Sequence, residues 1–274
     1  MRVKFLGTAA AEGIPAPFCT CPTCNYAREH GGKNIRTRSQ CLINDDLLID
    51  FPPDTYMHTL TSGLDLTRVK YLFITHAHSD HFYPYDLLLR ASPYGNSEGT
   101  LEIFCNQTVC NTIQAVLRER GKSQENRKIH LNPISPFETV RVGQYNVLAL
   151  EALHTAAKPC MFFSVEDSEK RFLYAHDTGF FPEKTMNCIS SMRYDCISID
   201  CTYGHLRTGN AKHLGLLDVD EMRRRLFVNG NISPRTRIIL NHFSHNGIES
   251  FDELKNRASR KGFEVTYDGL EIEI

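Results

Sequence analysis

The sequence lacks an excess of either charge, an apolar run long enough to cross a membrane, and the apolar segment near its start that directs secretion. Its 274 residues hold 31 Lys and Arg against 32 Asp and Glu, so the chain creates no strong positive field that would hold a polyanion. We therefore expect a soluble, cytoplasmic protein that has no membrane segment and no long nucleic acid as its partner.

Nucleotide-binding loops and internal repeats are also missing. The small-residue stretch at 7–13 follows a strand-like run, but it lacks the glycine spacing of a dinucleotide-binding loop or a P-loop. We interpret this stretch as a place where the backbone packs closely beside a site. The chain length alone allows one large domain or two small ones.

Cysteine is plentiful, and most of it is scattered. Seven of the ten cysteines stand singly within strand-like or helix-like segments, which is typical of reduced thiols in a protein core. These seven are Cys41, Cys105, Cys110, Cys160, Cys188, Cys196 and Cys201. We therefore do not expect a framework of disulfides.

The other three cysteines form a Cys-x-Cys-Pro-x-Cys motif, Cys19, Cys21 and Cys24. This spacing can place three thiolates around one point, and a tetrahedral structural zinc would then need a fourth ligand from elsewhere in the chain. A redox pair or three idle thiols are the alternatives. We favour zinc because no thioredoxin-like strand and helix surround the motif.

A second motif follows the apolar run at 69–75, where His76, His78, Asp80 and His81 occur within six positions. The run predicts a buried strand, and two histidines two residues apart can point at one ion beyond its end. The other two residues lie past a turn, where they can point at a second ion. Imidazole beside carboxylate suits zinc, manganese or iron. The alternative is a polar loop that only caps the next helix.

Single ligand-type residues end four further strand-like runs: Asp50, His154, Asp177 and His242. Each alone has an ordinary explanation, because a lone histidine is commonly a satisfied polar residue and an aspartate commonly a turn residue. A rigid sheet can however hold a site through its strand ends. We expect Asp50 to hold the histidine loop by hydrogen bonds, since metal-binding histidines normally need such partners.

The rest of the chain alternates between strand-like and helix-like segments. We expect further strands over 101–105, 145–153, 161–165, 171–175, 195–201, 236–240, 264–267 and 270–274. We expect helices over 54–62, 85–91, 107–120, 182–192, 218–228 and 249–259. Residues 121–135 are polar and end near prolines, so we expect a loop there.

Taken in chain order, the motif from Thr75 to His81 and the later strand-end ligands resemble the metallo-β-lactamase superfamily. That resemblance implies an α+β fold, an αββα four-layer sandwich of two mixed sheets between helices, with a dinuclear site at one edge. Its ligands run from residue 76 to residue 242 and must meet in one place. We therefore expect residues 1–274 to form a single domain with a zinc knuckle near 19–24.

Within the superfamily, the cysteine motif and a histidine three positions after His242 resemble the phosphoribosyl cyclic phosphodiesterases of bacterial phosphonate breakdown, the carbon–phosphorus lyase pathway. The resemblance implies that His245 is the fourth ligand of the structural zinc and that His213 lies over the substrate phosphate. His205 is nearby in the sequence and competes for that role. Relatives that process tRNA carry a long arm that has no counterpart here.

The same resemblance implies two ligand sets in the active site. His76, His78 and His154 would hold one divalent ion, and the other would be held by Asp80, His81 and His242. Asp177 would bridge the two ions, for which zinc and manganese are the first candidates and iron the third.

The activity that this site implies is hydrolysis of a small phosphodiester, with a cyclic one favoured, by a hydroxide that bridges the two ions. Asp80 and His213 are the expected catalytic residues, with His213 protonating the departing oxygen. A thioester or lactone hydrolase is the enzyme alternative, and a non-catalytic metal-binding carrier is the other. The sequence leaves a homodimer open.

Overall fold

The computed structural model describes residues 1–155, 160–206, 212–248 and 250–274. In this part of the chain the strands form two seven-stranded sheets. The first sheet has the order β14 (Leu270–Glu273), β1 (Arg2–Gly7), β2 (Gln40–Ile43), β3 (Leu47–Ile49), β4 (Tyr71–Phe73), β5 (Leu101–Cys105) and β6 (Ile129–Pro133). The second has the order β13 (Glu264–Val265), β12 (Arg237–Asn241), β11 (Cys196–Asp200), β10 (Arg171–Ala175), β9 (Met161–Glu166), β8 (Tyr145–Glu151) and β7 (Thr139–Val142).

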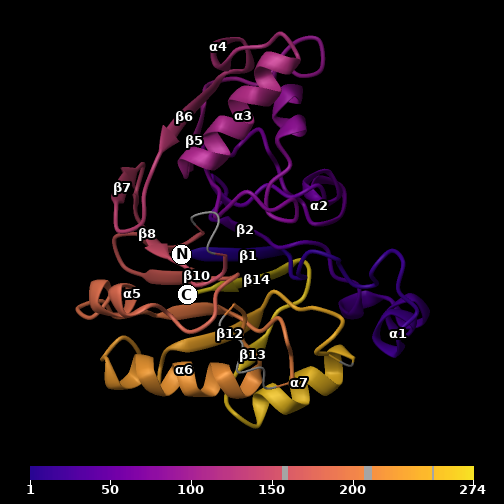
Figure 1. Ribbon diagram of the computed structural model, residues 1–274, viewed down its shortest axis with the longest axis vertical. Helices are drawn as coiled ribbons and strands as arrows, with labels where there is room; N and C mark the ends of the chain where they lie inside the picture. Colours follow the sequence, from indigo (N-terminus) through magenta and orange to yellow (C-terminus); the bar gives the residue numbers. More distant parts are fainter. Residues whose placement is uncertain (156–159, 207–211, 249) are drawn as a thin grey trace.

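Helices cover the two outer faces of this pair of sheets (Figure 1). On the first sheet lie α2 (Thr55–Thr61), α3 (Gln107–Glu119), α4 (Gln124–Arg127) and the 3-10 helix η2 (Pro84–Arg90), and on the second α5 (Glu183–Cys188), α6 (Leu216–Val228) and α7 (Phe251–Ser259). The helix α1 (Pro22–His30), followed by the short 3-10 helix η1 (Gly32–Asn34), projects at the side. This is the expected αββα arrangement, and the α+β prediction is confirmed.

Three apolar clusters hold the four layers together. One lies between the sheets and includes Phe5, Phe73 and Phe163, while the other two lie between each sheet and its helices. Because strands such as β10 are covered on both faces, their residues are almost all buried, as in Phe172 and Leu173. Continuous apolar runs of this kind are what a sheet buried on both sides requires.

Parallel pairing directs several strand ends to one edge. Strands β3 to β6 run parallel, and so do β10 to β13, so their carboxyl ends gather where the two sheets meet. The sheets are also joined there, because the backbone N–H of Ala10 donates to the carbonyl of Phe243 and the N–H of Phe243 donates to the carbonyl of Thr8. Ligands usually bind at such an edge of a sheet.

The expectation of a loop at 121–135 is wrong. This segment contains α4 and β6, and β6 pairs parallel with β5 at the edge of the first sheet. Ile129 and Leu131 are buried while His130 between them is exposed, so the apolar alternation is real but too short to stand out in a polar segment. Pro133 is tolerated because it ends an edge strand.

Other boundaries differ in smaller ways. The segment at 85–91 forms a 3-10 helix rather than an α-helix, and the helix expected at 182–192 covers only Glu183–Cys188. Helix α1 and strands β2 and β7 had no clear sequence signal. Of the seven scattered cysteines, all but the half-buried Cys188 are buried as expected.

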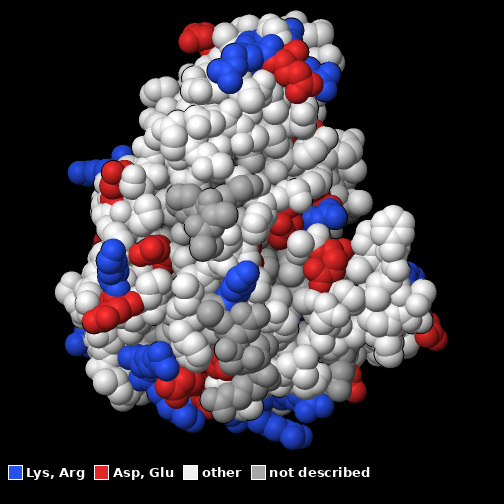
Figure 2. All heavy atoms as spheres, in the orientation of Figure 1, with Lys and Arg blue, Asp and Glu red and all other residues white. Residues whose placement is uncertain are grey.

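Charges are mixed over the surface. On the face shown in Figure 2, Lys and Arg lie among Asp and Glu, and the arginines of α6 have acidic neighbours one helical turn away. Among the described residues, no helix combines the length and the apolar character needed to cross a membrane.

Tyr145 connects the two sheets by hydrogen bonds. Its side chain is fully buried, and its hydroxyl on β8 accepts from the side chain of Asn44 at 2.7 Å and donates to Asp46 at 2.8 Å. Both partners belong to the hairpin between β2 and β3, so these bonds cross from one sheet to the other. Burial raises the pKa of Tyr145 to about 12, so the hydroxyl keeps its proton at neutral pH.

We expect Tyr145→Phe to lower the free energy of unfolding by about 1–2 kcal/mol, because it removes the hydroxyl that bonds Asn44, Asp46 and Gln144. Urea unfolding followed by circular dichroism measures this change. Tyr94→Phe is the matched control, since the side chain of Tyr94 is 68% exposed. Equal stability of the two variants would show that the link between the sheets contributes nothing.

Candidate metal centre

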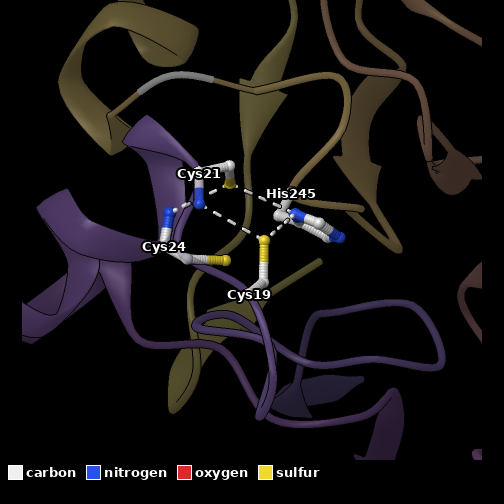
Figure 3. Close-up of side chains that lie close together, drawn as sticks. All are labelled: Cys19, Cys21, Cys24 and His245. Carbon is white, nitrogen blue, oxygen red and sulfur yellow. Dashed lines mark hydrogen bonds between the residues drawn. The ribbon is translucent and has the colours of Figure 1, made fainter.

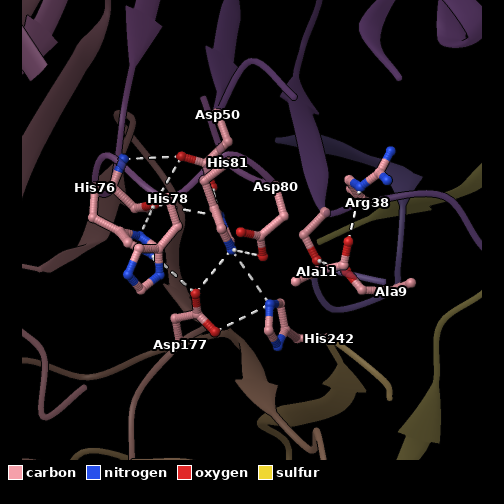
Figure 4. Close-up of polar contacts among 12 residues, drawn as sticks. Ala9, Ala11, Arg38, Asp50, His76, His78, Asp80, His81, Asp177 and His242 are labelled. Carbon is pink, nitrogen blue, oxygen red and sulfur yellow. Dashed lines mark hydrogen bonds and ion pairs between the residues drawn. The ribbon is translucent and has the colours of Figure 1, made fainter. Parts of the chain in front are cut away.

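Three side chains of the site sit at strand ends in an unusual backbone conformation. Asp50 follows β3, Asp177 follows β10 and His242 follows β12, and all three have positive φ angles of 67°, 51° and 63°. This left-handed region is unfavourable for residues other than glycine and is often found at functional sites. Figure 4 shows the side chains of Asp177 and His242 directed toward each other and that of Asp50 directed toward His81.

The first group of ligand-type residues is His76, His78, His154 and Asp177, whose ligand atoms all lie within 4.8 Å of one another. Nδ1 of His78 lies 2.9 Å from Nε2 of His76 and 3.2 Å from Nε2 of His154. Oδ2 of Asp177 lies 3.1 Å from Nε2 of His76. These are the residues that the sequence analysis assigned to one ion, together with the expected bridge.

The second group is Asp80, His81, Asp177 and His242, and all four are buried. Nε2 of His81 lies 2.9 Å from Oδ2 of Asp177, 3.3 Å from Oδ2 of Asp80 and 3.3 Å from Nε2 of His242. Nε2 of His242 lies 3.1 Å from Oδ1 of Asp177. Asp177 therefore belongs to both groups, as expected for a bridging carboxylate.

The spacing and charge of these donors fit metal ions. Nitrogens that bind one tetrahedral zinc at about 2.05 Å lie about 3.3 Å apart, close to the separations found here. Burial lowers the pKa of His154 to about 4, which keeps this imidazole in the neutral form that binds metal. Burial alone would raise the pKa of Asp177, but the charges of His242 and His81 hold it well below its usual value.

His81 shows that negative charge is in excess at the second group. Its burial lowers its pKa, yet Asp177, Asp50 and Asp80 outweigh this and raise the pKa well above the usual value for histidine. The surroundings of this nitrogen thus favour a positive charge, which a bound divalent cation would supply.

Asp50 lies behind the second group and makes the contacts that the sequence analysis expected. One of its oxygens accepts from the backbone N–H of Thr75 at 2.9 Å and from the Thr75 hydroxyl at 2.8 Å. The other lies 2.7 Å from Nδ1 of His81, which leaves Nε2 of that ring facing the site. Asp50 is fully buried, so these bonds fix the orientation of the histidine loop.

His213 lies beside the site and is held by a carboxylate that sequence reasoning missed. Nδ1 of His213 is 3.0 Å from Oδ2 of Asp200, and the other oxygen of Asp200 accepts from the backbone N–H groups of Thr202 and Leu214. Burial lowers the pKa of His213, but Asp200 and then Asp177 outweigh it and raise the pKa to about 9. Asp200 ends β11, and its place at a strand end is the signal that could have identified it.

A cavity of about 230 Å³ opens onto both groups. His213 lines it, and His205, the competing candidate, does not. The wall opposite the histidine loop is formed by residues that the sequence analysis did not select: Glu12, Thr202, Tyr203, Ser244 and Asn246. These polar groups come from three loops, after β1, β11 and β12, so nothing in the sequence indicates that they form one wall.

The cysteine motif forms a separate cluster with His245 (Figure 3). Nδ1 of His245 lies 3.4 Å from Sγ of Cys19 and 3.3 Å from Sγ of Cys21, and Cys24 completes the group. A tetrahedral zinc with sulfur at about 2.3 Å and nitrogen at about 2.05 Å places these atoms about 3.6 Å apart. The cluster therefore fits the zinc site that the sequence analysis expected, including its fourth ligand.

The thiols of this cluster differ in pKa. Burial opposes ionisation of Cys21, but hydrogen bonds from His245 and the backbone of Cys24 lower its pKa to about 6. Burial raises the pKa of Cys24 to about 12. Cys21 also caps helix α1, because its sulfur accepts from the backbone N–H of Cys24. The helix begins at the motif, which fixes the spacing of two of the ligands.

Comparison with curated proteins finds partial matches. Ribonuclease Z of Listeria welshimeri is 24% identical over 157 residues, which are 56% of this chain and 46% of that protein. Coenzyme PQQ synthesis protein B of Methylobacterium radiotolerans is 31% identical over 107 residues, which are 34% of this chain and 36% of that protein. The matches thus span less than half the length of these two relatives.

Solved structures match over the whole chain. A diphosphatase from the PhnP family has a TM-score of 0.76 at 16% identity, covering 100% of this chain and 97% of that one. Zn²⁺-bound PqqB from Methylobacterium extorquens has a TM-score of 0.76 at 17% identity and is covered completely. Human tRNase Z, short form, has a TM-score of 0.70 at 17% identity, covering 100% of this chain and 99% of that one. At these identities the likeness establishes the fold.

The family is established by sequence. The profile of the beta-lactamase superfamily domain matches residues 46–237, well over half of the chain, and includes every histidine and aspartate of the first group. Together with the two-sheet architecture, this match shows that the chain belongs to the beta-lactamase superfamily and has the metallo-β-lactamase fold.

Proposed function

We propose that this protein is a dinuclear-metal hydrolase that acts on a small phosphodiester. The observation that carries the proposal is the position of Asp177, whose Oδ2 lies 3.1 Å from Nε2 of His76 and whose Oδ1 lies 3.1 Å from Nε2 of His242. A carboxylate that faces two ligand groups in this way can bridge two ions. Paired ions about 3.5–4 Å apart are typical of phosphatases and nucleases.

His76, His78 and His154 would hold one ion, and Asp80, His81 and His242 would hold the other. When bound, two such ions supply an activated water and stabilise negative charge that develops on phosphate oxygens. Zinc, manganese and iron all suit a set of imidazoles and carboxylates. Asp50 contributes by keeping His81 in position.

His213 is the proton donor in this proposal. With a pKa of about 9, His213 is protonated at neutral pH. It lines the cavity next to Asp177, and its Nδ1 lies 3.6 Å from Oδ1 of Asp177. Nδ1 of His213 lies 3.0 Å from Oδ2 of Asp200, which fixes the orientation of the ring beside the cavity. A positioned general acid typically contributes roughly 10²–10⁴-fold to the rate.

The size and charge of the protein favour a small substrate. The cavity that the described residues enclose is about 230 Å³, below the range of roughly 300–1,000 Å³ that is usual for sites of drug-sized ligands. Figure 2 shows no continuous basic surface on this face, and the net charge is −1. A small cyclic phosphodiester meets both limits, as in the phosphoribosyl cyclic phosphodiesterases that the sequence resembles.

A substrate panel tests this proposal. Manganese-loaded and zinc-loaded protein is assayed with a ribose cyclic phosphate, bis(p-nitrophenyl) phosphate, a thioester and a lactone. We expect turnover of the phosphodiesters, with Asp177→Asn reducing it by about 10²-fold or more. Turnover of the thioester or the lactone alone would show that the protein is a thioester or lactone hydrolase. Full metal loading without turnover of any substrate would indicate a non-catalytic metal-binding carrier.

Three metal atoms per chain are expected. Two belong to the histidine groups and one to the cysteine cluster, where a closed thiolate site should retain zinc longer than an open site does. Elemental analysis before and after a short treatment with chelator should find about three atoms and then about one. The structural zinc is ruled out if freshly loaded protein contains two metal atoms or fewer per chain. It is also ruled out if Cys21→Ser loses the chelator-resistant atom without any fall in melting temperature.

Leaving groups distinguish proton donation from phosphate binding. An alkoxide needs a proton as its bond to phosphorus breaks, whereas p-nitrophenolate does not. We expect His213→Ala to slow hydrolysis of the cyclic alkyl phosphate at least about tenfold more than hydrolysis of the nitrophenyl diester. His205→Ala is the matched control. Equal losses on both substrates in His213→Ala would assign phosphate binding to this residue instead.

The pH dependence follows from the same proton. Because His213 must be protonated to act, kcat for the cyclic alkyl phosphate should fall as pH rises through about 9, the pKa of this group. Asp200→Asn removes the main charge that raises this pKa, so burial should dominate and move the fall to lower pH. Rate profiles for variants with equal metal content measure the shift. If kcat of Asp200→Asn falls at the same pH as kcat of the unsubstituted protein, a group other than His213 controls this fall.

A further inference from the structure

Glu12 lies between the cysteine cluster and the cavity of the histidine groups. It belongs to the loop after β1, and it lines the cavity together with Ala10 and Ala11. One oxygen, Oε1, accepts a hydrogen bond from the hydroxyl of Ser244 at 2.5 Å and lies 3.7 Å from Nε2 of His245. The carboxylate therefore faces one residue of each site.

The contact with His245 has the arrangement of an outer partner of a metal ligand. Nδ1 of this ring faces the sulfurs of Cys19 and Cys21, so the other ring nitrogen, Nε2, points away from the cluster and toward Glu12. Histidines that bind metal almost always give their second N–H to a carboxylate, a carbonyl or water. Glu12 is the carboxylate that the structure places there.

The contact with Ser244 continues into the cavity wall. The Ser244 hydroxyl accepts from the backbone and the side-chain N–H of Asn246, both at 3.2 Å, and Asn246 and Ser244 line the cavity. Ser244 is also two residues after His242, and its backbone N–H donates to the carbonyl of Thr202. Glu12 thus fixes a polar wall beside the second ligand group.

The backbone of this loop does not depend on the Glu12 side chain. The N–H of Ala10 donates to the carbonyl of Phe243 at 2.9 Å, and Nε of Arg38 donates to the carbonyl of Ala11 at 2.9 Å (Figure 4). The N–H of Gly13 closes a turn on the carbonyl of Ala10. A substitution of Glu12 should therefore leave the loop folded and change only the two side-chain contacts.

We propose that Glu12 is a positioning residue shared by the two sites. It orients His245 as a ligand of the cysteine zinc site, and through Ser244 it positions the wall that contacts substrate. The second half of this proposal rests on the proposed function. The first half depends only on the cysteine cluster.

Zinc release tests the first half without any activity measurement. Zinc-loaded protein is mixed with excess EDTA, and the zinc left in the cysteine cluster is measured over time with a colorimetric reagent after unfolding. We expect Glu12→Ala to lose this zinc about 10–100-fold faster than the unsubstituted protein, because removing an outer partner usually lowers metal affinity by about that factor. Glu12→Gln keeps a hydrogen-bond acceptor without the charge, so its rate of zinc release should lie between those of Glu12→Ala and the unsubstituted protein.

Two further variants separate the contacts. Glu29→Ala removes an exposed carboxylate from helix α1 of the same motif and should leave zinc release unchanged. Ser244→Ala removes the cavity contact alone, so it should also release zinc at the unsubstituted rate. With the zinc site saturated, Ser244→Ala and Glu12→Ala should each raise KM for bis(p-nitrophenyl) phosphate by about 3–10-fold with kcat nearly unchanged, the pattern of lost uniform binding.

The proposal is overturned if Glu12→Ala retains zinc as long as the unsubstituted protein does. It is also overturned if Ser244→Ala releases zinc as fast as Glu12→Ala, because faster release would then come from a loosened strand end. Unchanged KM in both variants would overturn the second half. If the unsubstituted protein turns over no phosphodiester, the proposed function fails separately. Binding of inorganic phosphate, measured by calorimetry, then replaces KM in deciding the second half.

Discussion

Charge balance around Asp177 is the constraint on which the rest of this structure depends. Asp50, Asp80, Asp177 and Asp200 are all buried within one region, and burying several carboxylates is costly unless positive charge accompanies them. The histidines that face them supply part of that charge, as the raised pKa values of His81 and His213 show. Divalent ions would supply the rest and would release His81 to act as a neutral ligand. The donors are therefore arranged for cations rather than for one another.

The architecture makes such an arrangement possible because rigid strands carry the donors to one edge. Asp50, Asp177 and His242 each occupy the left-handed region within two residues of a strand end, which costs of order 1–2 kcal/mol per residue. Loops alone would relax this strain. Here the neighbouring strand ends and their hydrogen bonds oppose relaxation, as when Asp50 binds both the backbone and the hydroxyl of Thr75.

The sequence was sufficient for the parts of the site that depend on local pattern. A strand followed by His76, His78, Asp80 and His81 shows its chemistry within ten residues, and the fold class followed from the resemblance that these residues carry. Other parts depend on contacts between distant segments. Glu12 and Ser244 are 232 positions apart, so nothing near either one indicates their contact. Strand β6 was missed because its short alternation is weaker than the polar residues around it, and pairing with β5 overrides that local preference.

The end of β12 connects the cysteine cluster to the second histidine group. His242 belongs to the histidine group and His245 to the cysteine cluster, and Phe243 between them is fully buried and pairs with Ala9 in the loop after β1. Only Phe243 and Ser244 separate the two histidines, and both are buried, so this segment has little room to move. Because His242 is already held at a positive φ angle, its ring direction depends on both of its neighbours. The cysteine cluster and the second histidine group thus share one strand end, which ties the N-terminal loop to the edge where the strand-end ligands meet.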